Sequence, residues 1–132
     1  MKELITIWVI ATGCVAIHEF SHALAVKLFG QNITKIQIGK LEVLYFSKIS
    51  MGLLPFSGSV KFKIEHSLST IKQIIIYIVG PLATGILLLF CFYYQFLYRN
   101  AVIAMLITQL FFSIFGEKSD ISQIVFLIRR TK

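Results

Sequence analysis

Five residues near the N-terminus, HEFSH at 18–22, have the types and spacing of a zinc site. His18 and His22 are four positions apart, so on a helix they share one face about one turn apart. Both imidazoles can then bind one Zn²⁺, and Glu19 can take a proton from water at the metal. Zinc lowers the pKa of that water from about 16 towards 7 and polarises a carbonyl, as peptide hydrolysis requires. The pattern predicts zinc as the cofactor and Glu19 as a general base.

The composition is that of an integral membrane protein. Hydrophobic residues make up 57% of the chain and charged residues 14%, with a mean hydropathy of +0.82. Soluble domains contain about 25% charged residues. An ionisable group at membrane depth costs about 2.5–3.5 kcal/mol even on lenient scales, so three within five residues of an apolar helix require a function. The membrane setting therefore favours the zinc interpretation over a chance H-E-x-x-H.

The pattern of apolar runs predicts a membrane α-helical fold in a single domain, residues 1–132. A hydrocarbon core of about 30 Å needs roughly 20 helical residues. Three stretches qualify as spans, the third only if it continues beyond Gly116 as a broken or re-entrant helix: 4–25, 74–97 and 101–115. The loop 27–72 alternates apolar and polar residues between glycines, which predicts short β-strands.

The basic residues predict the orientation of these spans. The loop 27–72 holds seven lysines and the C-terminal tail four basic residues, eleven in all, against Lys2 and Arg99 on the opposite side. Lys and Arg favour the cytoplasmic side, so the loop and the C-terminus are expected there. The net charge of +7 is thereby explained, and no nucleic-acid partner is expected. The predicted location is the cell membrane, as a multi-pass protein.

A third zinc ligand has to come from few carboxylates. The chain has six acidic residues, of which Glu19 is assigned as the base and Glu3 lies at the far end of the first span. Glu117 and Asp120 follow the third span, which returns to the side of the membrane where the motif lies. From geometry alone these two are equivalent candidates.

Gly80-Pro81 lies in the second span at a depth similar to that of the motif. Proline frees a backbone carbonyl and glycine permits close helix approach, although a simple packing kink is an equal alternative. Thr84, one turn later, could hydrogen-bond across helices or to its own backbone.

Four segments resemble the site-2 protease family of intramembrane zinc metalloproteases, in its minimal three-helix form. They are HEFSHALAVKLFG at 18–30, LPFSGSVKF at 54–62, GPLAT at 80–84 and SD at 119–120. The resemblance implies that His18, His22 and Asp120 bind zinc, that Glu19 is the base, and that the active site lies towards the cytoplasmic face.

The resemblance also implies how substrate is bound. The family's loop forms a small sheet that presents the substrate as a strand, and the segment 54–62 looks like that element. Gly58, Pro81 and Thr84 are accordingly expected to bind substrate. The expected partners are the lipid bilayer and a membrane-embedded peptide or single-span protein, whose identity the sequence does not give. A homo-oligomer stays open, because three spans are few for shielding a wet site from lipid.

The chain departs from the common family pattern at Ser21, Thr84 and Ile121, where many members have glycine, asparagine and glycine. These departures leave a second hypothesis, a catalytically inactive member that acts by binding in an immunity or regulatory role. A zinc-dependent transporter is a weaker third hypothesis, because the chain has no second metal cluster.

Overall fold

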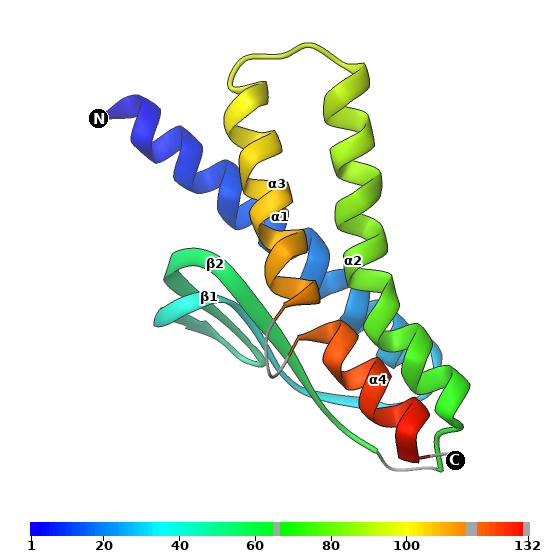
Figure 1. Ribbon diagram of the computed structural model, residues 1–132. Coiled ribbons are helices and arrows are strands. Elements are labelled where there is room, and N and C mark those ends of the chain that lie inside the picture. Colours follow the sequence, from blue (N-terminus) through cyan, green and yellow to red (C-terminus); the bar gives the residue numbers. More distant parts are fainter. Residues whose placement is uncertain (65–66, 116–118, 131–132) are drawn as a thin grey trace.

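The computed structural model describes residues 1–64, 67–115 and 119–130, which form four helices and a β-hairpin. In chain order the elements are α1 (Lys2–Leu28), β1 (Asn32–Phe46), β2 (Ile49–Lys63), α2 (Thr70–Tyr93), α3 (Arg99–Ile114) and α4 (Asp120–Arg130). Figure 1 shows α2 and α3 side by side with α1 crossing behind them, and α4 beside the lower half of α2.

Two of the helices are long and apolar enough to cross a membrane, by length and composition. At about 1.5 Å per residue, α1 with 27 residues and α2 with 24 both exceed a hydrocarbon core of about 30 Å. Helix α3 is apolar but has only 16 residues. Helices therefore occupy all three apolar stretches predicted as spans, and two of them pass the length criterion.

The ends of α2 differ from the predicted 74–97. The helix starts at Thr70, because Ser69 caps it by accepting a hydrogen bond from the Lys72 backbone N–H at 3.4 Å. It ends at Tyr93, since Tyr94 is extended. The apolar aromatic run beyond Tyr93 thus connects α2 to α3. Hydropathy alone cannot distinguish such a connection from a continuing helix.

The hairpin consists of two strands of 15 residues each, where several short strands were expected. The strands bend sharply, so Ile36, Gln37 and Ile38 each have two partners in β2, one set at 58–60 and the other at 49–51. Gly39 stands at the bend with φ 82°, and a Cβ there would lie 2.8 Å from the Leu54 carbonyl oxygen. Alternation indicates strand but not such bending, because the bend depends on backbone contacts between distant residues.

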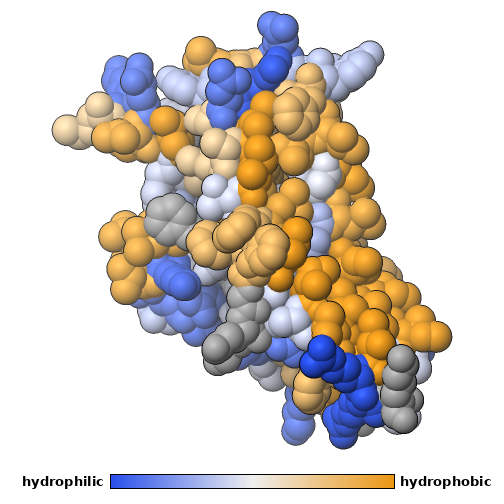
Figure 2. Space-filling model, in the orientation of Figure 1, coloured by the Kyte–Doolittle hydropathy of each residue, from blue (hydrophilic) through white to orange (hydrophobic). Residues whose placement is uncertain are grey.

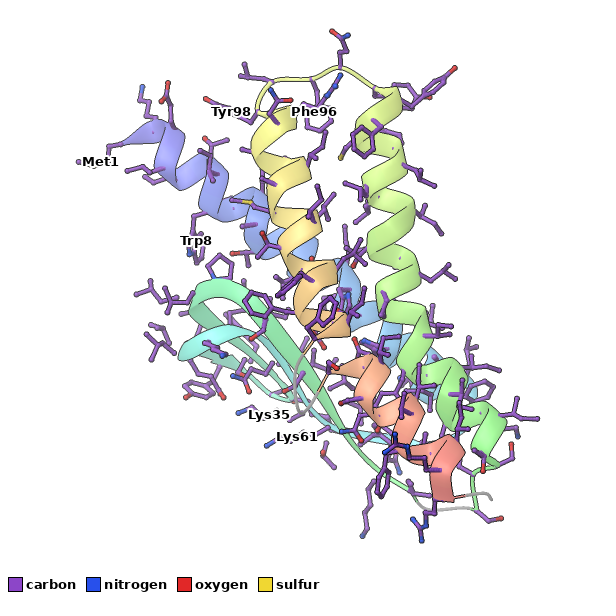
Figure 3. All side chains as sticks on the ribbon, viewed as in Figure 1. Met1, Trp8, Lys35, Lys61, Phe96 and Tyr98 are labelled. Atoms are coloured by element: carbon purple, nitrogen blue, oxygen red, sulfur yellow. The ribbon has the colours of Figure 1, made fainter. Side chains whose placement is uncertain are left out.

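The hairpin contacts α1 at two places along the helix. Val15 and Ala23 of α1 pack in a buried cluster with Ile36 and Ile38 of β1. Near the N-terminus, the Trp8 indole N–H donates to the Leu53 carbonyl at 2.6 Å, and Figure 3 shows Trp8 projecting towards the hairpin. These contacts hold the hairpin alongside the helix that carries the H-E-x-x-H motif.

The outer surface of the helices is apolar. Leu82, Ile86 and Leu89 of α2 are more than half exposed. Figure 2 shows an apolar surface along the helices, with hydrophilic residues gathered at the top and the bottom of the view. A soluble monomer seldom exposes so large an apolar area, so this surface is suited to lipid.

Candidate metal centre

The H-E-x-x-H motif lies in the middle of α1 and is buried. His18, Glu19 and His22 are 4–6% exposed, although α1 is otherwise largely apolar. The helical spacing brings the two imidazoles together, with 3.2 Å between their Nε2 atoms and 4.8 Å between ring centroids. The predicted common face is therefore present in the structure.

Asp120 closes the site from the other end of the chain. Ser119 caps α4, since its hydroxyl accepts from the Ser122 N–H at 3.2 Å, and this cap places Asp120 in the first turn. One Asp120 carboxylate oxygen lies 3.3 Å from His18 Nε2 and the other 3.5 Å from His22 Nε2. The structure brings together the three predicted ligands, whereas Glu117 lies outside the described residues.

Hydrogen bonds behind the two imidazoles determine their tautomers. His22 Nδ1 lies 2.5 Å from the Ile76 carbonyl, which can only accept, so Nδ1 carries the proton. The Thr84 hydroxyl donates to the Gly80 carbonyl at 3.2 Å and therefore accepts from His18 Nδ1 at 2.8 Å. In its neutral form each ring therefore carries its proton on Nδ1 and presents the lone pair of its Nε2 atom to the Asp120 carboxylate.

This arrangement fits a zinc ion. The ligand atoms of His18, His22 and Asp120 lie within 4.8 Å of one another. Ligands about 2.0–2.1 Å from a tetrahedral zinc are separated by about 3.3 Å, close to the 3.2 Å between the two Nε2 atoms and to the 3.3 Å and 3.5 Å from these atoms to the two Asp120 carboxylate oxygens. For the neutral imidazoles, two lone pairs and a carboxylate converge, and a bound cation would offset their repulsion.

Two glycines make room for the motif. A Cβ at Gly80 would overlap the imidazole of His22, so α2 can approach α1 at this point only with glycine. A Cβ at Gly58 would lie 2.5 Å from Glu19 Cγ and 2.5 Å from the Gln37 carbonyl oxygen. The sequence indicated close approach at Gly80 but not that His22 is the side chain accommodated.

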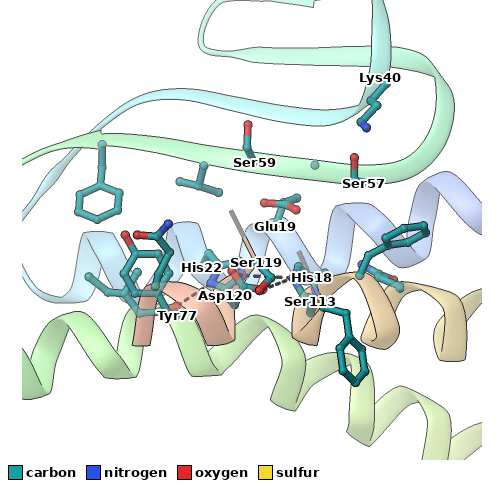
Figure 4. Close-up of a pocket in the computed structure, with 18 residues that line it drawn as sticks. His18, Glu19, His22, Lys40, Ser57, Ser59, Tyr77, Ser113, Ser119 and Asp120 are labelled. Atoms are coloured by element: carbon teal, nitrogen blue, oxygen red, sulfur yellow. Dashed lines mark hydrogen bonds and ion pairs between the residues drawn. The ribbon is translucent and has the colours of Figure 1, made fainter. Parts of the chain in front are cut away.

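A cavity of about 640 Å³ opens beside these residues, between β2 and helices α1, α3 and α4. Figure 4 shows Glu19 between the His–Asp cluster and β2. The lining combines apolar surface with many polar residues, including Lys40, Ser57, Ser59, Gln109, Ser113, Ser119 and Gln123. The cavity has room for water and for an extended peptide segment beside Glu19.

The three residues expected to bind substrate lie in different settings. Gly58 lines the cavity beside Glu19. Thr84 is 1% exposed and lies behind His18, and neither it nor Pro81 belongs to the lining. Substrate binding by Pro81 and Thr84 therefore stays a prediction, while Thr84 has an observed partner in His18.

Comparison with known proteins gives one match. The family model for peptidase family M50 matches residues 6–131, nearly the whole chain. No curated protein and no solved structure shows a significant match.

Proposed function

The chain belongs to peptidase family M50, a family of membrane-embedded zinc metalloproteases, and we propose that it is an intramembrane peptidase. It hydrolyses a peptide bond in or near the membrane segment of a small peptide or single-span protein. The observation that carries this proposal is the convergence of His18, His22 and Asp120 beside the buried Glu19 in an apolar helix.

Each of these residues has a role in the proposal. His18, His22 and Asp120 hold zinc, which when bound activates water and polarises the substrate carbonyl. Glu19 accepts the proton of the attacking water and passes it to the leaving amine. Gly58 supports this role because the absence of a side chain lets β2 pass directly over Glu19. The substrate lies extended along β2, next to Gly58.

The proposed orientation places the hairpin and the C-terminus on the cytoplasmic side, with α3 as a third, shorter span. The eleven basic residues of the hairpin region and the tail, against two on the other side, support this arrangement. Water then reaches Glu19 from the cytoplasm through the cavity that Glu19 lines.

The test is a comparison of membrane peptides in cells that produce wild-type protein or Glu19→Gln. The amide cannot accept a proton, so cleavage should fall by about 10²–10⁴-fold while zinc is retained. Mass spectrometry should then find at least one uncut membrane peptide that accumulates with Glu19→Gln.

Glu3→Gln is the matched control, because Glu3 lies in the first turn of the same helix. It should cleave as the wild type does. If Glu19→Gln leaves every membrane peptide unchanged, the proposal is wrong, and the inactive binding protein becomes the better account.

A further inference from the structure

One polar side chain of α3 is largely buried and makes no hydrogen bond within the part of the chain that the structure describes. Gln109 is 8% exposed, and its amide makes no hydrogen bond with any residue that the structure describes. Its neighbour Thr108 is different, since that hydroxyl is exposed and donates to the Ala104 carbonyl at 2.8 Å. The Gln109 amide is not among the fully buried polar atoms without a partner, so it is accessible to a molecule inside the cavities that Gln109 lines. An amide left free in an apolar helix of a membrane protein is available to pair with a ligand.

Gln109 lines two cavities. It lines the cavity that contains Glu19 and also a second, largely apolar cavity of about 490 Å³. The second cavity is formed by α1, α3 and the tip of β2, with Trp8, Leu53 and Met105 among its lining residues. Gln109 is thus the lining residue that the two cavities share, and an extended chain occupying both would lie beside it.

We infer that Gln109 is a substrate-binding residue that hydrogen-bonds a peptide group of the substrate's apolar segment. A primary amide both donates and accepts, so it pairs with a backbone C=O and N–H that have left a helix. Unwound peptide groups in an apolar setting need such a partner. The inference rests on the proposed function. It assigns Gln109 as the residue that hydrogen-bonds the unwound substrate segment near the site.

The test uses Gln109→Met, which keeps the length of the side chain and removes the amide. The probe is a synthetic copy of the peptide that accumulates uncut with Glu19→Gln. We expect KM to rise about tenfold, the value of one hydrogen bond, with kcat and zinc content unchanged. The Tm should not fall, because the Gln109 amide makes no hydrogen bond with the residues that the structure describes.

Gln73→Met is the matched control. The Gln73 side chain lies outside both cavities and donates to the Leu68 carbonyl at 3.0 Å. This variant should lower the Tm and leave KM unchanged, the opposite pattern to Gln109→Met. An unchanged KM for Gln109→Met overturns the inference, and so does a lower Tm, which would reveal a structural partner. Since Glu19→Gln tests cleavage itself, failure of the inference is distinguishable from failure of the proposed function.

Discussion

The hairpin and the metal centre both bring ionisable side chains into contact, but they balance charge in different ways. On the hairpin, the Lys35 ammonium lies 2.6 Å from the Glu42 carboxylate, so the pair neutralises itself. In the proposed metal centre, neutral imidazoles whose Nδ1 protons point to the far side turn their Nε2 lone pairs towards the Asp120 carboxylate. The hairpin pair is complete without a ligand, whereas the proposed metal centre is suited to a cation.

The largest effect is expected from Gly80→Ala, which should break the proposed metal centre without replacing any of its three ligand residues. The new methyl group would overlap the His22 imidazole and force the ring or α2 to move. Loss of a residue that hydrogen-bonds a metal ligand lowers metal affinity by about 10–100-fold. Zinc affinity should fall further than this in Gly80→Ala. Competition with a chelator measures this change.

Gly85→Ala in the same helix provides the control, since a Cβ there meets nothing within 4 Å. Alanine should stabilise the helix by about 0.5–1 kcal/mol and leave zinc affinity unchanged. Equal zinc affinities for the two variants would contradict the packing of α2 against His22.

A smaller effect is expected from Thr84→Val, which removes the acceptor of the His18 Nδ1 proton while keeping the shape of the side chain. Zinc affinity should fall about 10–100-fold. Thr84→Ser keeps the hydroxyl and should retain most of the affinity. If Thr84→Val instead keeps its zinc affinity and raises KM, Thr84 contacts substrate and does not orient His18.

The smallest effect is expected at the hairpin. The hydrogen bond from Lys35 lowers the pKa of the Glu42 carboxyl, so the folded state favours the ionised form. The pair's contribution to stability is therefore present above the ordinary pKa of glutamate and is lost as the pH falls through the lowered value.

Glu42→Gln should slightly lower the Tm at neutral pH, remove this pH dependence and reduce the effect of added salt. Zinc affinity should not change. A large loss of zinc from Glu42→Gln would show that the two regions are coupled, contrary to the comparison.

The clustering of His18, His22 and Asp120 was predictable for two reasons. The two histidines are close in the sequence, and the chain has few carboxylates. The i, i+4 spacing fixes the relation of His18 to His22 on any helix, and few carboxylates could supply a third ligand. Choosing Asp120 over Glu117 required the family resemblance. The structure places Asp120 there through the Ser119 cap, which the sequence analysis did not identify.

The contacts between distant segments were not predictable in this way. The clearance of Gly80 for His22 depends on where α2 crosses α1, and the double pairing of Ile36 depends on how the hairpin bends. The unpaired amide of Gln109 likewise becomes apparent only when its surroundings are known. Periodicity predicts which side of a helix or strand is buried, but not which atoms of other elements contact that side.

The most direct test of the account is the zinc content of purified wild-type protein, Asp120→Asn and Glu117→Gln, measured by elemental analysis with chelator competition. We predict one zinc per chain in the wild type and in Glu117→Gln, and a large loss of affinity in Asp120→Asn. Wild-type protein without zinc, or Asp120→Asn with unchanged affinity, would contradict the assignment of His18, His22 and Asp120 as the metal centre.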